Sequence, residues 1–129
     1  MAQTWCFEAD DAVPAQVQRD NFIRYLGDYA ASGADLESAG TIYGELVGNV
    51  ARHVGGPIAL FCYWPDGYAT LCVRDYGRGF AYSRRRRAQV LCETGRGLYI
   101  VSALARHIDV ESGPWGCEVR VALPVRRSR

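Results

Sequence analysis

The chain has 129 residues, the size of one compact domain, and 49% of them are hydrophobic and 22% charged, as in a globular rather than a disordered protein. Its formal net charge of +1 gives no overall reason to expect nucleic acid or an anionic membrane as a partner. All 15 basic residues are arginine, which excludes a Walker A motif, a protein-kinase strand lysine and Schiff-base chemistry, since each of these needs a lysine.

The first third of the chain predicts one strand and two helices. A short aromatic stretch at residues 4–8 predicts a strand, and Pro14 suits the first turn of a helix that ends before Gly33. The apolar face of that helix comprises Val17, Phe22, Ile23, Leu26 and Tyr29. Asp35 can cap the next helix, which ends at the two glycines before Pro57. The apolar stripe of this second helix comprises Ala39, Tyr43, Leu46, Val47, Val50 and Val54.

The rest of the chain predicts two hairpins separated by a long loop and a helix. Residues 58–63 and 68–73 have the pattern of strands joined by a Pro-Asp-Gly turn. Residues 76–97 are rich in Gly and Arg without apolar periodicity, and so long a loop in a small domain is usually functional or mobile. A helical face returns at residues 98–105, and strands at 108–110 and 117–123 form a closing hairpin. This order predicts an α+β fold, a mixed, mostly antiparallel sheet covered by three helices on one face.

The cysteines do not form the usual patterns of disulfide or zinc-binding proteins. The five cysteines include no Cys-x-x-Cys pair, and Cys62, Cys72 and Cys117 lie among Phe, Leu and Val. We expect these three to be small core residues of a reduced, cytoplasmic protein. No signal-peptide pattern opens the chain and no apolar run approaches roughly 18 residues, so neither secretion nor a membrane partner is expected.

Two polar residues stand out on the second predicted helix. Glu45 and Asn49 lie four positions apart, so their side chains project from one face, roughly opposite the apolar stripe. The carboxylate can serve as a general base, and the carboxamide can bind Mg²⁺, which prefers oxygen ligands. The alternative is a pair of solvated side chains on a surface helix.

Two glycine-rich stretches flank the long loop. Asp75 ends a predicted strand, where its carboxylate can accept a hydrogen bond from an exocyclic amine, and the following Gly77 and Gly79 allow a ligand to approach the backbone. The second stretch opens a helix, where free amides and the helix dipole favour phosphate oxygens. It comprises Thr94, Gly95, Arg96, Gly97 and Leu98. Taken separately, the first stretch is also typical of a simple turn, and the second of a flexible hinge before a helix.

In combination and in this order, the three motifs resemble the GHKL superfamily of ATP-binding domains, most closely its anti-sigma factor serine-kinase branch. Residues 45–53 resemble the N box of that branch, residues 75–80 its G1 box and residues 95–101 its G2 box. The resemblance spans about residues 8–124 and implies the Bergerat fold, a two-layer α/β sandwich. We therefore expect residues 1–129 to form a single histidine kinase-like ATPase domain, with an ATP lid at about 80–95 and a disordered tail at 125–129.

The resemblance also implies the cofactors ATP and Mg²⁺ and a role for each site residue. Glu45 would be the catalytic base, Asn49 would hold Mg²⁺, and Asp75 would bind the adenine N6. The remaining nucleotide contacts would come from Gly77, Gly79, Thr94, Gly95, Arg96, Gly97 and Leu98.

The sequence departs from this family pattern at two places. Cys117 follows Gly116 where the branch usually has threonine, whose hydroxyl supports the adenine-binding aspartate, and a thiol is a weak hydrogen-bonding group. The predicted lid contains four consecutive arginines at 84–87, which are either a solvated segment or a contact for the γ-phosphate or an acidic partner.

Three functions fit this pattern. The first is a Mg-ATP-dependent protein serine kinase that acts with a sigma factor and an anti-sigma factor antagonist, as a monomer or a homodimer and without nucleic acid. The second is a non-catalytic module that binds ATP or sequesters a sigma factor or another regulator. The third is a detached histidine-kinase catalytic domain, although the glutamate of the N box favours the serine branch.

Overall fold

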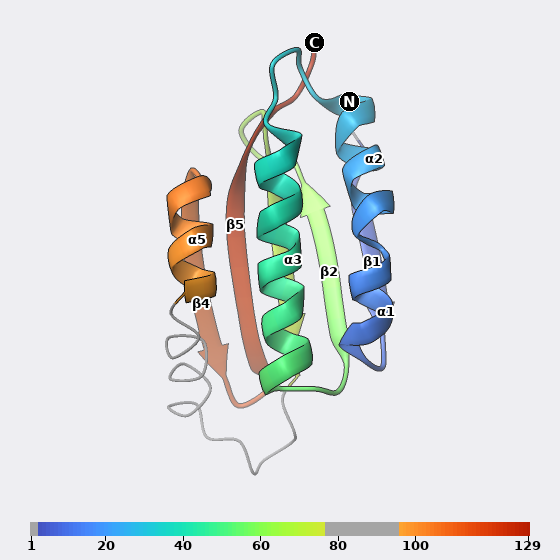
Figure 1. The fold of residues 1–129 in the computed structure, drawn as a ribbon, viewed down its shortest axis with the longest axis vertical. Helices are drawn as coiled ribbons and strands as arrows, with labels where there is room; N and C mark the ends of the chain where they lie inside the picture. The colour runs from blue at the N-terminus through green and yellow to red at the C-terminus, as the bar shows by residue number, and fades with distance from the viewer. Residues whose placement is uncertain (1–2, 77–95) are drawn as a thin grey trace.

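In the computed structural model, residues 3–76 and 96–129 are described, with the side chains of residues 96–98 excepted. They form a five-stranded sheet with the strand order β1-β2-β3-β5-β4, and helices cover one of its faces (Figure 1). In chain order the elements are β1 (Trp5–Ala9), α1 (Ala12–Val17), α2 (Arg19–Tyr29), α3 (Leu36–His53), β2 (Ile58–Tyr63), β3 (Tyr68–Asp75), α5 (Arg96–Leu104), β4 (His107–Gly113) and β5 (Gly116–Arg126).

The predicted α+β class and two-layer arrangement are confirmed, with two corrections. Every strand pairing in the described segments is antiparallel, so the sheet is not mixed. The single helix predicted before Gly33 is two helices that meet at Gln18. The break lets the Arg19 side chain donate a hydrogen bond to the carbonyl of Gly40 on α3, at 3.0 Å. Val17 is consequently 75% exposed, and the predicted apolar face belongs to α2 alone.

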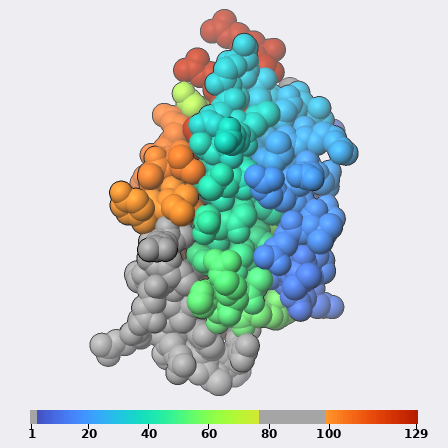
Figure 2. Space-filling model, in the orientation of Figure 1, coloured from blue at the N-terminus to red at the C-terminus, as the bar shows by residue number. Residues whose placement is uncertain are grey.

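Helix α3 is the centre of the helical layer, and its surface runs between the blue of α1 and α2 and the orange of α5 (Figure 2). The predicted cap is confirmed, because Asp35 accepts hydrogen bonds from the Ser38 amide at 3.0 Å and hydroxyl at 2.7 Å. These bonds lower the pKa of the Asp35 carboxyl. The helix ends before Gly55 and Gly56, whose positive φ angles turn the chain into β2.

The core lies between α3 and the sheet and extends under α1 and α2. Alternate residues of β2, β3 and β5 face the helices and are buried, as the period of a strand requires. Tyr43 of α3 is fully buried, stacks on Phe22 of α2 and donates a 2.6 Å hydrogen bond to the Ala15 carbonyl of α1. Burial raises the pKa of the Tyr43 phenol. This one side chain therefore ties α3 to both N-terminal helices.

The C-terminal residues are ordered by pairing, which corrects the disordered tail predicted at 125–129. Val125 is fully buried within β5, and Arg127 forms a bridge with Ala30. The Ser128 amide donates a 2.7 Å hydrogen bond to the Tyr29 carbonyl. These contacts come from segments about 100 residues earlier in the chain and hold the end of β5 against α2.

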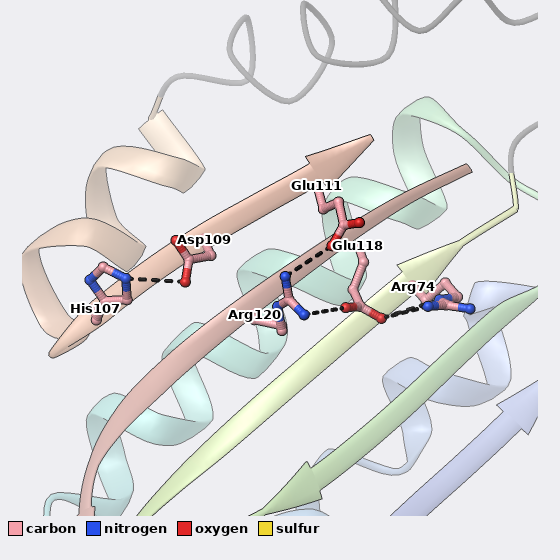
Figure 3. A network of polar contacts seen from close by, with 6 residues as sticks. All are labelled: Arg74, His107, Asp109, Glu111, Glu118 and Arg120. Atoms are coloured by element: carbon pink, nitrogen blue, oxygen red, sulfur yellow. Dashed lines mark hydrogen bonds and ion pairs between the residues drawn. The ribbon is translucent and has the colours of Figure 1, made fainter. Parts of the chain in front are cut away.

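The sheet face opposite the helices carries a network of charged side chains (Figure 3). Glu118 of β5 lies between Arg74 of β3 and Arg120, with N–O distances of 3.1 and 3.3 Å. Arg120 also reaches Glu111 of β4 at 3.0 Å, and Glu118 raises the pKa of the Arg120 guanidinium. Glu111 and Glu118 are directly opposed in the register, so Arg120 offsets a repulsion between like charges. The network links β3, β5 and β4 in one register.

The expected burial of Cys62, Cys72 and Cys117 is confirmed, but only two of them lie in the core. Cys62 and Cys117 are buried in the core, and Cys72 is buried on the opposite side of the sheet. Burial raises the pKa of the Cys72 thiol to about 11.

The hydroxyl of Tyr43 is expected to contribute measurably to stability. Tyr43→Phe removes the shorter of two hydrogen bonds to the buried Ala15 carbonyl and leaves only the one from the Gln18 amide at 3.2 Å, so the free energy of unfolding should fall by about 1 kcal/mol in urea denaturation. The matched control is Tyr99→Phe, because Tyr99 is 75% exposed. Equal stability of the two variants would contradict this account of the α1–α3 contact.

Candidate functional site

Among the described residues, the predicted site residues Asn49 and Asp75 lie at one end of the molecule. There α3, β3 and β4 end, β5 begins, and α5 begins near the same end (Figure 1). The antiparallel pairing of β3, β5 and β4 brings residues 75, 117 and 112 into one row across the sheet. Asn49 reaches the same end because it lies in the last turns of α3.

Asn49 is buried, with 2% of its surface exposed, and this corrects its expected place roughly opposite the apolar stripe of α3. It is rotated by about 240° from Tyr43 around the helix axis, which turns it away from α1 and toward the side where α5 packs on α3. Its Oδ1 accepts a 2.9 Å hydrogen bond from Nη2 of Arg52. Its Nδ2 is buried and has no hydrogen-bond partner among the described residues.

An unpaired buried amide donor makes this position a candidate ligand site, since buried polar groups are nearly always hydrogen-bonded to protein, water or a ligand. A structural asparagine would have both ends of its carboxamide satisfied. The alternative of a solvated asparagine is excluded by its burial.

Glu45 lies one turn before Asn49 and is half-buried. Within the described part of the chain, no hydrogen bond or ion pair engages its carboxylate. The two residues do share one side of α3, as their spacing predicts. Glu45 is therefore a carboxylate next to the site that is not committed to a structural contact with a described residue.

Asp75 is the last residue of β3 and is buried, with 2% exposure. Its side chain points to the helical face, because it continues the alternation of the buried Leu71 and Val73. The register pairs it with Cys117 of β5, which is 1% exposed. A buried carboxylate at this position can accept a hydrogen bond from a ligand amine.

The close approach of β5 to Asp75 depends on Gly116. Gly116 has a φ of +150°, and a Cβ at this position would lie 2.0 Å from the backbone oxygen of Asp75. No residue with a side chain fits there without moving the two strands apart. The glycine thus keeps Cys117 directly beside the aspartate.

Ser112 is a site residue that the sequence reasoning missed. It lies opposite Cys117 in the β4–β5 pair, and its hydroxyl donates to the Cys117 sulfur at 3.8 Å. A hydroxyl is thus present beside position 117, supplied from β4 rather than by the threonine of the family pattern. The closing hairpin predicted from the sequence was the available signal, because its turn fixes which residues of β4 and β5 face each other.

The remaining predicted contacts are not brought into view. Gly77, Gly79, Thr94 and Gly95, the lid at 80–95 and the arginines at 84–87 lie outside the described residues. Arg96, Gly97 and Leu98 form the first turn of α5, so a helix does begin where the glycine-rich stretch predicts one. The start of a helix offers backbone amides and a positive dipole end to an anion.

Asn49 offers a ligand of the kind that Mg²⁺ prefers. No group of three His, Cys, Asp or Glu side chains is placed to hold a metal ion in residues 3–76 and 99–129. Mg²⁺ needs few protein ligands, because it keeps several waters and takes oxygens from phosphates. The carboxamide oxygen of Asn49 is a donor of the kind it prefers.

Comparison with known families indicates an ATPase domain. The model of the family described as "Histidine kinase-like ATPase domain" matches residues 11–123. The match begins at the N-cap of α1, ends within β5, and so includes the whole site described above. No curated protein sequence matches the chain.

Substitution of Gly116 is expected to damage both the sheet and the site. Gly116→Ala should lower the free energy of unfolding by about 2 to 4 kcal/mol, because the new methyl group clashes with the Asp75 backbone. Gly33→Ala is the matched control, since Gly33 also has a positive φ but open space around its α-carbon. Chemical denaturation of both variants tests this, and similar losses would show that the contact with Asp75 is unimportant.

Proposed function

The chain belongs to the family of histidine kinase-like ATPase domains, and we propose that it transfers the γ-phosphate of ATP to a serine of a partner regulatory protein, as anti-sigma factor kinases do. Family membership supports ATP binding itself. The observation that carries the proposal is the buried pair of polar groups at one end of the fold, the Asp75 carboxylate and the Asn49 carboxamide with its unpaired donor.

We assign adenine recognition to Asp75. Its carboxylate, shielded from water, accepts a hydrogen bond from the adenine N6 amine, and shielding strengthens that bond. Cys117 of β5 lies opposite Asp75, and the Ser112 hydroxyl of β4 donates a hydrogen bond to the Cys117 sulfur.

We assign the phosphates to the opposite side of the site. Asn49 Oδ1 would be the protein ligand of Mg²⁺, and the amides of Gly95, Arg96 and Gly97 would receive the phosphate oxygens at the start of α5. When bound, Mg-ATP supplies a transferable phosphoryl group whose charge is already partly neutralised. The protein then needs to provide position and charge rather than a lysine.

We assign the base to Glu45. It lies one helical turn from Asn49 and has no hydrogen bond or ion pair with a described residue, so it is available to orient a serine hydroxyl and accept its proton. Gly77, Gly79, Thr94 and Leu98 complete the proposed nucleotide contacts on the strength of the family motifs.

The proposed partners are a sigma factor and its anti-sigma factor antagonist, in the cytoplasm, with a homodimer as a further option. Among the described helices, none has the length and apolar character to cross a membrane.

A second candidate is a non-catalytic module that binds ATP and sequesters a regulator. The observation that favours it is Cys117, a buried thiol at the position where the kinase branch carries a threonine hydroxyl. The two candidates differ in whether Glu45 contributes to turnover.

Asp75→Asn should weaken ADP binding by about tenfold to a hundredfold, because the amide replaces a charged acceptor with a weaker, partly donating group. Isothermal titration measures the affinity, and circular dichroism checks that the variant is folded. Asp28→Asn is the matched control on the exposed surface of α2. Undiminished affinity in folded Asp75→Asn would remove the adenine assignment.

Glu45→Gln should reduce ATP turnover by about 10²- to 10⁴-fold while ADP affinity stays within a few-fold, because a base acts in the transition state rather than in the ground state. The measurement is ADP release from saturating Mg-ATP, paired with a binding titration. If the wild-type chain binds ATP but neither hydrolyses it nor phosphorylates a partner, the non-catalytic module is the correct account.

A further inference from the structure

The Asn49 oxygen that the proposed function assigns to Mg²⁺ is already occupied by an arginine of the same helix. Arg52 lies three residues later, and its Nη2 donates to Asn49 Oδ1 at 2.9 Å. Arg52 is itself exposed to solvent, whereas Asn49 is only 2% exposed. The guanidinium thus covers a buried carboxamide from the solvent side of α3.

The helix is built to receive this guanidinium. Gly48, one turn before Arg52, is buried, and a Cβ at this position would lie 2.9 Å from Nη1 of Arg52 and 3.5 Å from its Cζ. Glycine inside a helix costs about 1 kcal/mol relative to alanine. Because Gly48 has no side chain, the space beside its α-carbon is open, and the guanidinium of Arg52 occupies that space.

From these contacts we propose that Arg52 is a positioning residue that competes with the divalent cation for Asn49. Without nucleotide, Arg52 holds the carboxamide by its oxygen and keeps the unpaired Nδ2 turned inward; binding of the cation requires Arg52 to release that oxygen. This inference rests on the proposed Mg-nucleotide function of the site.

The competition follows from charge and geometry. A guanidinium within hydrogen-bond distance of Oδ1 repels a divalent cation bound to the same atom, and the repulsion is stronger away from bulk water. With 2% of Asn49 exposed, the cation also cannot reach the oxygen while Arg52 covers it. Removing or displacing Arg52 should therefore make the site respond to less Mg²⁺.

The test uses the complete chain, ADP and MgCl₂. Isothermal titration of ADP at a series of Mg²⁺ concentrations gives the Mg²⁺ concentration that produces half of the gain in ADP affinity. Arg52→Gln should lower this concentration by about tenfold or more, the factor expected for the loss of one competing charged hydrogen bond. Gly48→Ala keeps the charge of Arg52 but pushes its guanidinium aside. This variant should therefore lower the half-maximal Mg²⁺ concentration by a smaller factor, about twofold to threefold.

The chain provides matched controls for both variants. Gly44→Ala adds a methyl group to the same helix where no atom lies within 4 Å, and Arg24→Gln removes an exposed arginine from α2. Neither should change the Mg²⁺ requirement. Gly48→Ala should also be at least as stable as Gly44→Ala, because only a flexible side-chain end has to move.

The outcomes separate this inference from the function on which it rests. If the wild type binds ADP with a Mg²⁺ dependence that Arg52→Gln and Gly48→Ala leave unchanged or shift to higher Mg²⁺, the competition is wrong and the proposed function stands. If the wild type binds no ADP, or binds it without regard to Mg²⁺, the proposed Mg-nucleotide site fails and the competition fails with it.

Discussion

The register between β3 and β5 is the constraint on which the site depends. Side chains alternate between the two faces of a strand, so a shift of one residue would turn Asp75 to the open face and bring Arg74 into the core. Two independent features hold the register: the glycine at position 116 admits the close approach of the strands, and Glu118 pairs with arginines on the opposite face. A charge network on one side of the sheet thus positions a buried carboxylate on the other.

Helix α3 serves both the packing of the core and the chemistry of the site. One side carries Tyr43 and joins the N-terminal helices, while the side rotated toward α5 carries Asn49. The carboxamide of Asn49 is buried, and among the described residues only its oxygen has a hydrogen-bond partner. The packed core therefore holds the Asn49 carboxamide rigidly, although no described core residue hydrogen-bonds to its Nδ2.

Features set by local sequence were predictable, and features set by distant contacts were not. The Asp35 cap, the glycines that end α3 and the β2–β3 hairpin follow from signals within a few residues. The burial of Asn49 depends on the tertiary packing around α3, and the pairing of the tail depends on its bridge to Ala30. The hydroxyl of Ser112 beside Cys117 is equally invisible to periodicity, since it arises from pairing across a hairpin.

The central claim is that this end of the molecule is an adenine-nucleotide site in which a buried carboxylate recognises the base. Adenine presents an amine donor where guanine presents the O6 acceptor, so the carboxylate of Asp75 should attract one and repel the other. The most direct measurement is isothermal titration of the wild-type chain with ADP and with GDP in Mg²⁺. The account predicts one site per chain and at least about tenfold tighter binding of ADP; equal affinity for the two nucleotides, or no binding of either, would contradict it.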